Sequence, residues 1–429
     1  MEIIELTGEN RKKLKEVLAK RSTNHFSEIE ERVAAIIEDV KKRGDEALFE
    51  YSERFDHYPL NADNIRVTKE EIDAAVKKVE PRFIEVLKKA AENIRVFHEK
   101  QKRISWIDTK ADGTILGQKF TPLATAGVYV PGGKAAYPSS LLMSVVTAKV
   151  AGVERIVMMT PPGQGGEISA ETLAAAQIAG VDEIYRVGGA QAIAALAYGT
   201  ESIPKADKIC GPGNIYVALA KKAVFGQVSI DSVAGPSEIL VLADETADAR
   251  YVAADLLSQA EHDEMASAIL VTTSAALAEA VKKEIEAFLP KLSRREIIEK
   301  SLEQFGFLFV AENMEMAIET VNDIASEHLE IITKDPYGDM TRVKNAGAIF
   351  LGAYSSEPLG DYFAGPNHIL PTNGTAKFFS PLNVDDFMKK TSIISYSREA
   401  LQRDCDDIVY FAEKEGLTAH ANSVAVRFQ

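Results

Sequence analysis

The sequence is poor in cysteine and in tryptophan. Two cysteines, Cys210 and Cys405, and one tryptophan stand among 429 residues. Two thiols allow a single disulfide, which is no framework for a chain of this length. A disulfide-stabilised secreted scaffold is therefore excluded, and a reducing cytoplasm fits best. A chain this long is expected to fold as two or more domains.

The sequence also lacks an excess of positive charge and a long apolar run. It has 64 acidic against 49 basic residues, a net charge of −15, which argues against nucleic acid or an anionic membrane as a partner. Lys149 and Glu154 interrupt the most apolar stretches, far short of a membrane span. The opening MEIIELTGENRKKLKEVL has no apolar core like that of a signal peptide. We expect a globular protein of the cytoplasm.

The common nucleotide fingerprints are missing too. No GxGxxG lies in a strand–turn–helix, and no GxxxxGK[ST] occurs. From about residue 124, however, strand-like and helix-like runs alternate four times: TAGVYVPGG and SSLLMSVVTAKVAG, RIVMMTPP and SAETLAAAQIAG, EIYRVGG and AQAIAALAYG, ADKICGPG and NIYVALAKKAV. Four successive β-then-α units predict a parallel sheet wrapped by helices, with ligands at the carboxyl ends of its strands.

Glycines gather at the ends of these predicted strands. They occur in Pro131-Gly132-Gly133 after Tyr129, in Gly188-Gly189-Ala190-Gln191 and in Gly211-Pro212-Gly213-Asn214. Glycine lets a backbone approach a ligand closely, and helix N-termini favour phosphate. The pattern indicates a nucleotide or another phosphate-sized ligand, with ordinary turn chemistry as the alternative. It does not identify the nucleotide.

The regions outside these units have textures of their own. Residues 1–25 read as a charged helical arm that packs on another element or subunit, and residues 27–100 as amphipathic helices. Trp106 and the polar DTKADG that follows predict the edge of a hairpin. After Val233–Asp244, strands and helices alternate again as a second α/β layer. The last segment, from Leu382, is separate in pattern and is predicted to be a small module.

The chain has seven histidines, and four of them lie in polar surroundings beside a carboxylate. These are His262 in SQAEHDE, His328 in ASEHLE, His368 in GDYFAGPNH and His420 in EKEGLTAH. Zinc and similar cations prefer imidazole nitrogen with carboxylate oxygen, and a general base needs a histidine oriented by an acid. Four distant clusters suit one site assembled in three dimensions. Four unrelated surface histidines are the alternative, as is expected of His25, His57 and His98.

One stretch, Glu357–Pro371 (EPLGDYFAGPNHILP), carries both an aspartate and a histidine. Asp361 and His368 stand seven residues apart, and glycines and prolines between them predict a loop. A fixed loop can aim an imidazole and a carboxylate at one point, although an ordinary connection has the same composition.

Two further pairs are predicted on helices. Gln259 and His262 stand three residues apart and share a face of the helix predicted over DARYVAADLLSQAEHD. Glu327 and His328 are expected at the C-terminal end of the helix predicted over MEMAIETVNDIASEH.

Seven short motifs stand in order along nearly the whole chain: GVYVPGG, GPGN, AGPSE, SQAEHD, ASEHLE, GDYFAGPNHILPT and EGLTAHANSV. Together they resemble the histidinol dehydrogenase family. The resemblance implies an α/β fold with two Rossmann-like domains similar to the aldehyde dehydrogenases. The larger, discontinuous domain would comprise residues 26–129 and 238–381, with residues 130–237 inserted. An N-terminal arm (1–25) and a C-terminal module (382–429) would cross to the partner in a homodimer.

The resemblance also implies the reaction and its residues. Members of the family oxidise L-histidinol through L-histidinaldehyde to L-histidine, the last steps of histidine biosynthesis, with one zinc ion per subunit and two NAD reduced. The zinc ligands would be Gln259, His262, Asp361 and His420. The acid–base residues would be Glu327 and His328. The cofactor contacts would be Tyr129, Gln191 and Asn214. The substrate contacts would be Ser237, His368 and Glu415, together with His328 and the four zinc ligands.

Residue chemistry alone leaves alternatives open. It would choose His368 in place of Gln259 as the fourth zinc ligand, because an amide ligand is uncommon for zinc. A zinc hydrolase, with Glu327 activating a metal-bound water, explains the histidine clusters but not the glycine-rich strand ends. A non-catalytic metal- or nucleotide-binding protein needs no Glu327–His328 pair. Cys210 is either a nucleophile that forms a thiohemiacetal or a small core residue, and the resemblance implies no covalent cysteine.

Overall fold

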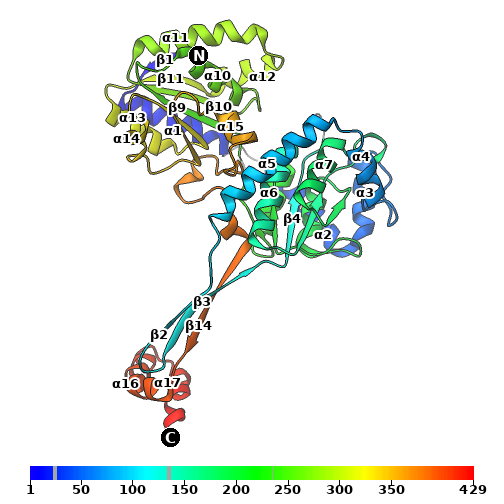
Figure 1. Ribbon diagram of the computed structural model, residues 1–429, viewed down its shortest axis with the longest axis vertical. Coiled ribbons are helices and arrows are strands. Elements are labelled where there is room, and N and C mark those ends of the chain that lie inside the picture. The colour runs from blue at the N-terminus through cyan, green and yellow to red at the C-terminus, as the bar shows by residue number, and fades with distance from the viewer. Residues whose placement is uncertain (23–26, 133–136, 234) are drawn as a thin grey trace. The chain divides into compact units, whose positions relative to one another are not determined.

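The computed structural model describes residues 1–22, 27–132, 137–233 and 235–429. Gly133 of the expected glycine loop and His25 lie outside the described residues. The chain divides into two compact units (Figure 1). The large unit comprises Met1–Gln101 and Ala124–Phe387, and the small unit comprises Lys102–Leu123 and Met388–Gln429.

The first sheet of the large unit has six strands. They are β1 (Ile3–Glu5), β9 (Glu238–Ala243), β10 (Ser267–Thr272), β11 (Gly306–Val310), β12 (His328–Ile332) and β13 (Ala348–Leu351). Their order is β1-β11-β10-β9-β12-β13, and all neighbouring strands run parallel. Starting from β9, the chain moves outward on one side, returns to the centre and moves outward on the other, which is the Rossmann order with β1 added at an edge.

Helices cover both faces of the six-stranded sheet. They are α1 (Gly8–Ser22), α10 (Ala249–Ala260), α11 (Ala275–Phe288), α12 (Arg295–Phe305), α13 (Met314–Ile324) and α14 (Pro336–Met340). Alternate residues of a strand face opposite sides, so Ile239 packs under α10, α11 and α12, whereas Leu240 packs under α1 and α13. Leu14 of α1 is buried in the second of these cores, so the predicted N-terminal arm packs on its own chain.

The second sheet of the large unit has five parallel strands. They are β4 (Thr125–Tyr129), β5 (Arg155–Met159), β6 (Glu183–Tyr185), β7 (Lys208–Cys210) and β8 (Ser229–Ile230), in the order β6-β5-β4-β7-β8. The four predicted β-then-α units are confirmed. Helices follow the first four strands in turn: α6 (Pro138–Ala151), α7 (Ala170–Ala179), α8 (Gly189–Tyr198) and α9 (Ile215–Val224).

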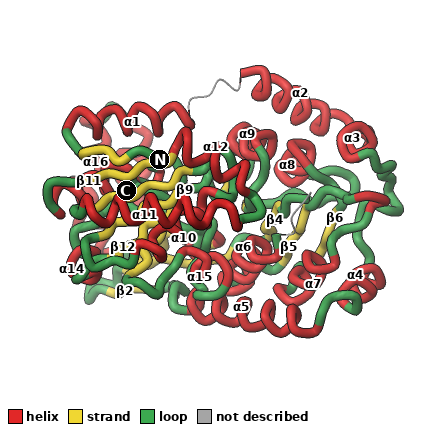
Figure 2. Tube along the Cα trace, turned by 90° about the horizontal axis from the view of Figure 1, so that it is seen from above, coloured by secondary structure: helices red, strands yellow, loops and turns green. Residues whose placement is uncertain are grey.

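An outer layer of helices surrounds the five-stranded sheet. It consists of α2 (Ser27–Arg43), α3 (Asp45–Asp56), α4 (Lys69–Val76) and α5 (Pro81–Glu99). The first two pack on α8 and α9, and the last two on α7 and α6, on the opposite face (Figure 2). The sequence grouped residues 26–129 with residues 238–381. In the structure, the apolar face of α2, with Val33 and Ile37, is buried instead against helices of the five-stranded sheet.

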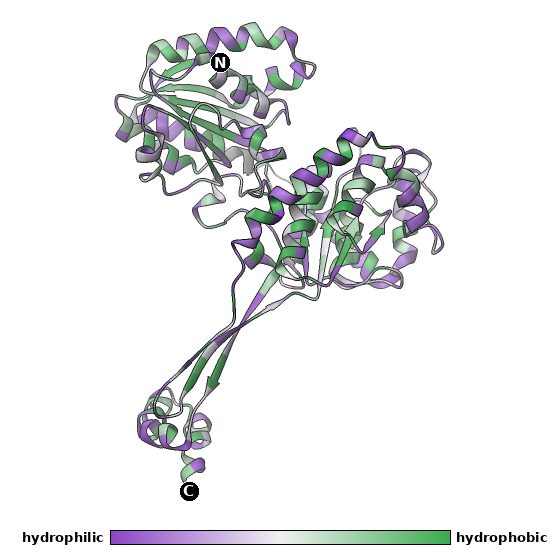
Figure 3. Cartoon of the chain, viewed as in Figure 1, coloured by the Kyte–Doolittle hydropathy of each residue, from purple (hydrophilic) through white to green (hydrophobic). Residues whose placement is uncertain are grey.

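The central strands of both sheets are apolar, as Figure 3 shows. Every residue of β9 and β10 is buried. Parallel strands covered on both faces read as continuous apolar runs, not as alternating ones. The predicted α/β fold with Rossmann-like sheets is therefore confirmed.

The small unit is built from one antiparallel sheet and two helices. Its strands are β2 (Trp106–Thr109), β3 (Ile115–Pro122) and β14 (Met388–Ser395), in the order β14-β3-β2, and its helices are α16 (Arg398–Lys414) and α17 (Thr418–Ala425). The hairpin predicted at Trp106 is confirmed. Short helical turns occur at Gln164–Gly166, Leu289–Lys291, Thr375–Lys377, Val384–Phe387 and Val426–Phe428. Within the described residues, no helix has the length and apolarity to cross a membrane.

Candidate active site

A charged cluster lies where β9 and β12 begin. Because the two strands are parallel neighbours, with His328 in register with Ile239, their first residues meet at the amino edge of the six-stranded sheet. The backbone N–H of Glu238 donates to Oε2 of Glu327 (2.9 Å), and the N–H of Glu327 donates to Oε2 of Glu238 (3.3 Å). Nδ1 of His328 donates to the carbonyl oxygen of Glu238 at 3.1 Å. The backbone thus fixes both side chains.

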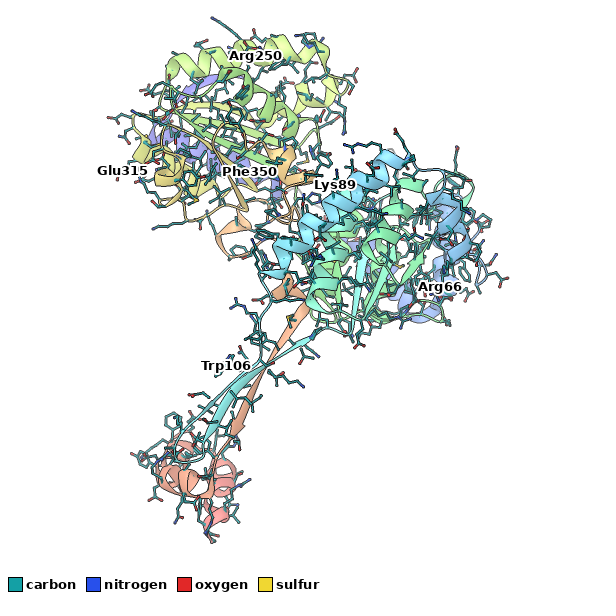
Figure 4. All side chains as sticks on the ribbon, viewed as in Figure 1. Arg66, Lys89, Trp106, Arg250, Glu315 and Phe350 are labelled. Atoms are coloured by element: carbon teal, nitrogen blue, oxygen red, sulfur yellow. The ribbon has the colours of Figure 1, made fainter. Side chains whose placement is uncertain are left out.

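The expectation that Glu327 and His328 end a helix is wrong. Helix α13 stops at Ile324, because Ala325 adopts a left-handed conformation (φ 54°) and caps it. His328 is the first residue of β12 and stacks obliquely on Phe350 of β13, with ring centroids 6.0 Å apart (Figure 4 labels Phe350). Glu327 therefore lies in the connection between α13 and β12, immediately before the buried strand.

The prediction of one continuous loop over Glu357–Pro371 is also wrong. Its first part forms α15 (Glu357–Tyr362). Pro358 occupies the first turn, where its missing N–H costs nothing. A Cβ at Gly360 would lie 2.6 Å from the ring of Phe350, so this glycine serves close packing rather than flexibility. Asp361 consequently projects from a short helix.

Two histidines bracket Asp361. Nε2 of His328 lies 3.6 Å from Oδ1 of Asp361. Nδ1 of His368 donates to the carbonyl oxygen of Asp361 (2.9 Å) and lies 3.7 Å from its Oδ1. On the other side of its ring, Nε2 of His368 accepts from Oγ of Ser140 at 3.1 Å. Because Ser140 lies in the first turn of α6, His368 connects the cluster to the five-stranded sheet.

The side chains around Asp361 fit a metal ion. One ligand atom each from His262, Glu357 and Asp361 lies within 4.8 Å of the others. Gln259 is 1% exposed, and among the described residues neither its amide oxygen nor its amide nitrogen has a hydrogen-bond partner. A buried amide without a partner is costly unless a ligand satisfies it. Imidazole nitrogen with amide and carboxylate oxygen is a donor set that zinc accepts.

Glu357 is the member of this cluster that the sequence analysis missed. It is 2% exposed and one helical turn before Asp361, so the two carboxylates share a face of α15. The four-residue spacing in EPLGD brings the two carboxylates together only because this segment is helical, whereas its glycine and proline predict a loop. Gln259 lies in the last turn of α10, whereas His262 lies two residues beyond that helix and is exposed, so the two do not share one helix face as predicted.

Burial and neighbouring charges shift the pKa values of the clustered side chains far apart from one another. Burial opposes protonation of His328, but the carboxylates of Glu327 and Asp361 outweigh it and raise the pKa of His328 to about 9. Burial raises the pKa of Glu327 to about 7. Burial acts in the same direction on Asp361, yet the imidazoles of His328 and His368 lower its pKa to about 2. Widely separated values for neighbouring groups are typical of acid–base sites.

Further carboxyl groups support Glu357 from behind. Its backbone N–H donates to Oε1 of Glu330 (2.8 Å), and its Oε2 accepts from Oγ of Ser258 (3.1 Å). Burial, together with the nearby charge of Asp361, raises the pKa of Glu357 to about 8. Burial, with Asp255 beside it, raises the pKa of Glu330 well above its ordinary value. Such a concentration of buried acid calls for a cation or for protons.

A cavity of about 960 Å³ opens at the carboxyl ends of the five-stranded sheet. Tyr129, Gln191 and Asn214, the three predicted cofactor contacts, all line it. The hydroxyl of Tyr129 accepts from the N–H of Gly189 at 3.0 Å, and Asn214 caps α9 through its side chain. Because these residues stand at the end of β4 and at the starts of α8 and α9, the cavity lies where the strand order reverses between β4 and β7. A position beside two helix N-termini is expected for a phosphate-bearing ligand.

A buried ion pair fixes the loop that borders this cavity. Nζ of Lys221 pairs with Asp231, and each side chain is 3% exposed. Nζ also donates to the carbonyl oxygen of Gly211 (3.0 Å), while Oδ2 of Asp231 accepts from the N–H of the same glycine (2.8 Å). Gly211 has φ +114°, and a Cβ there would collide with the carbonyl oxygen of Tyr129. Both backbone groups of Gly211 are thus clamped.

The structure places the remaining candidates as follows. Ser237 immediately precedes β9, beside Glu238 of the cluster. Glu415 and His420 lie in the small unit, where both line a hollow on α16 and α17. Cys210 is completely buried in β7, and burial raises the pKa of its thiol to about 12, which suits a core residue. His57 is exposed, but the expectation of a surface position for His98 is wrong, because that ring is buried against Gln101 (2.7 Å).

Two Rossmann-type sheets, one with a nucleotide-sized cavity and one with a buried acid–histidine cluster that fits a metal, are the framework of an α/β enzyme. Comparison with known proteins is specific. A family model for histidinol dehydrogenase matches residues 19–428. The histidinol dehydrogenase of Bacillus subtilis (strain 168) is 56% identical over 428 residues, covering 100% of this chain and 99% of that protein.

Two further comparisons agree. The histidinol dehydrogenase of Listeria monocytogenes serovar 1/2a is 55% identical over 424 residues, 99% of each chain. The crystal structure of histidinol dehydrogenase from Elizabethkingia anophelis is 37% identical, with a TM-score of 0.93, covering 100% of this chain and 98% of that one. The chain therefore belongs to the histidinol dehydrogenase family, as the sequence motifs predicted, and is an oxidoreductase of histidine biosynthesis.

Proposed function

We propose that this enzyme oxidises L-histidinol through L-histidinaldehyde to L-histidine in the cytoplasm, with zinc and two molecules of NAD. The observation that carries the proposal is the link between its two sites. His368 contacts Asp361 of the acid–histidine cluster on one side and Ser140 of α6 on the other. Tyr137, which precedes the same helix, lines the cavity of the five-stranded sheet. A substrate at the cluster and a dinucleotide in the cavity would therefore meet near the start of α6.

Gln259, His262 and Asp361 would hold the zinc ion, with His420 as a further ligand. Two observations support this set: the amide of Gln259 has no hydrogen-bond partner among the described residues, and ligand atoms of His262 and Asp361 lie close together. When bound, zinc supplies an anchor for nitrogen donors such as the imidazole and the amine of histidinol. Glu357 is close enough to orient Asp361 or to bind the ion itself.

Proton movements fall to Glu327 and His328. Loss of a hydride from an alcohol requires that its hydroxyl proton be removed, and the neutral form of His328 is the base that we assign. Because the pKa of His328 is raised to about 9, the population of this neutral form, and with it the first oxidation, should increase as the pH rises toward 9. The carboxylates of Glu327 and Asp361 stabilise the imidazolium that results. The aldehyde must add water before a second hydride leaves. Glu327, whose pKa burial raises to about 7, can take a proton from that water near neutral pH. Both groups are buried, which limits competing proton exchange with solvent.

A direct assay tests the reaction, the cofactor and the metal together. NADH formation is measured with L-histidinol and NAD, first on the purified enzyme, then after chelation, then after zinc is restored. We expect two NADH per histidinol, loss of activity on chelation and recovery with zinc. Folded, zinc-replete protein that forms no NADH would contradict the proposal, and a hydrolytic reaction at the same cluster would then be examined.

We further propose a homodimer in which the small unit of one chain completes the cluster of the other. Large apolar side chains are exposed on this unit: Trp106 is 51% exposed (Figure 4), Ile107 61%, Ile394 72% and Phe411 67%. So much apolar surface on so small a unit favours burial against a partner. Contribution from the same chain is the alternative for Glu415 and His420.

Mixed dimers test this arrangement. A His420→Ala chain is mixed with a His328→Ala chain, after each has been shown to be inactive alone. Shared sites predict that mixing restores activity, because one of the two sites then has both histidines. A mixture of co-folded chains that stays inactive would show that His420 acts within its own chain. The mass in solution, measured by light scattering, is the control for dimer formation.

A further inference from the structure

One carboxylate in the cofactor cavity has no assigned role. Asp56 is the last residue of α3 and lines the cavity together with Tyr129 and Gln191. Its Oδ2 is shielded from solvent and has no hydrogen-bond partner among the described residues. Burial raises the pKa of this carboxyl to about 6. A buried acceptor left without a donor is costly, and a carboxylate more so, unless a ligand supplies the hydrogen bonds.

The five-stranded sheet lacks the acid that usually serves this purpose. In dinucleotide-binding Rossmann sheets, an acidic residue after the second strand accepts a hydrogen bond from a ribose hydroxyl. The second strand here is β5, and it is followed by Thr160, Pro161, Pro162 and Gly163, none of which is acidic. Asp56 reaches the same cavity from α3, in the outer layer of helices.

We propose that Asp56 accepts hydrogen bonds from a ribose of the dinucleotide and thereby selects NAD over its 2′-phosphorylated form. The inference rests on the proposed NAD-dependent function. The adjacent hydroxyls of a ribose offer two donors, and the carboxyl group of Asp56 lies in the wall of the cavity to accept them. A 2′-phosphate would instead bring negative charge against a half-buried carboxylate, where repulsion is screened less than in open solvent. Discrimination by an unfavourable contact is a common source of specificity.

Two arginines in the same cavity sharpen the prediction. Arg32 and Arg54 also line it, but both are exposed. Nη2 of Arg32 lies 3.9 Å from Oε2 of Glu28. The guanidinium of Arg54 lies over the ring of Phe55, 5.3 Å from its centroid. Exposed arginines can attract either dinucleotide, because both carry a pyrophosphate. Removal of the Asp56 charge should therefore admit the 2′-phosphorylated form, since positive charge is already present.

The test compares the wild-type enzyme with Asp56→Asn and Asp56→Ser, and with Asp63→Asn as a control for loss of one acid. Asp63 is exposed on the connection after α3 and does not line the cavity. The ratio of kcat/KM for NAD to that for NADP is measured with L-histidinol. We expect it to fall by about 10-fold or more in both Asp56 variants, through a higher KM for NAD and a lower KM for NADP. In the Asp63→Asn control, the ratio should stay close to that of the wild type. In the Asp56 variants, kcat with NAD should change little.

Binding of NADH and NADPH, followed by fluorescence without substrate, separates this inference from the proposed reaction. Equal discrimination in the wild type and in both Asp56 variants would overturn the role of Asp56, even if NADH formation from histidinol succeeds. A wild-type enzyme that prefers NADPH would overturn it as well. An enzyme that binds NADH selectively, loses that selectivity with Asp56, and yet does not oxidise histidinol would contradict only the proposed reaction. Circular dichroism confirms that each variant is folded.

Discussion

The two sheets of the large unit share one strand order but carry their sites at opposite edges. The five-stranded sheet has its cavity at the carboxyl ends of its strands, around Tyr129 and Asn214. The six-stranded sheet has its acid–histidine cluster at the amino ends of β9 and β12, around Glu327 and His328. Topology alone therefore does not decide which edge is used; the groups exposed at each edge do.

The backbone explains the division. At the carboxyl edge of a parallel sheet, helices begin and offer N–H groups and positive dipole ends to a phosphate. At the amino edge, helices end and their negative dipole ends favour a cation. Helix α10 ends at Ala260, next to the candidate metal ligands Gln259 and His262. One edge thus suits an anion and the other suits a cation.

The carboxyl ends of the six-stranded sheet carry an aspartate that binds backbone N–H groups of two loops. Asp244 follows β9, and its carboxylate accepts from the N–H of Lys334 (2.7 Å) and from the N–H of Thr246 (3.0 Å). Asp244 thus ties the loop after β9 to the loop after β12 at these strand ends.

The largest expected effect is at the amino edge. His262→Ala should remove bound zinc and lower kcat by more than about 100-fold. The reason is that Asp361 and Gln259 alone would hold the proposed zinc ion too weakly once the imidazole is lost. Elemental analysis and NADH formation are measured on the same sample. Full activity in a zinc-free variant would show that the metal assignment is wrong.

Stability should be most sensitive at the carboxyl edge of the five-stranded sheet. Lys221→Met leaves Asp231 buried without its counter-charge and should lower the free energy of unfolding by about 3–5 kcal/mol, measured by urea denaturation. The neighbouring Lys222→Met removes an exposed pair with Glu30 and should cost about 1 kcal/mol or less. Equal effects of the two substitutions would show that the clamp on Gly211 contributes nothing special.

A subtler change should separate the two oxidation steps. Glu327→Gln is expected to slow oxidation of the aldehyde by about 100-fold, and more than it slows oxidation of the alcohol, because only the second step adds water. Single-turnover assays started from histidinol and from histidinaldehyde measure both rates. Equal losses in the two steps would contradict the assignment of Glu327 to the water.

The smallest effect on activity and stability is expected for a substitution in the core of the five-stranded sheet, in β7. Cys210→Ala should leave kcat unchanged and cost about 1 kcal/mol of stability, since a buried thiol with a pKa of about 12 packs but does not react. Titration of folded wild-type protein with a thiol reagent should leave Cys210 unmodified. Loss of activity without loss of stability would revive a covalent thiohemiacetal.

The carboxyl-edge site was the easier of the two to predict. Each of its parts follows a strand in a local β-then-α unit, so Gly189, Gln191 and Asn214 could be placed from the alternation of the sequence alone. The contribution of Asp56 could not, because α3 reaches the cavity only through the packing of an outer helix layer.

The amino-edge site was predicted as residues but not as geometry. The histidine and acid motifs identified His262, His328 and Asp361. However, the sequence pattern predicted a helix at Glu327 and His328, and a loop where the structure has α15. Local turn formers suggested the loop, and the close packing of Gly360 on Phe350 overrode them. Glu357 was lost with that helix.

The sequence by itself determined the family, the alternation of strands and helices, and the chemical groups available, because these depend on local pattern and side-chain identity. Only the tertiary structure decided which groups meet. It joined Glu327 to Glu238 through neighbouring parallel strands and bound the N–H of Lys334 to the carboxylate of Asp244. Such contacts connect residues far apart in the chain, and the free energy that favours them comes from the packing of both sheets, which no short segment encodes.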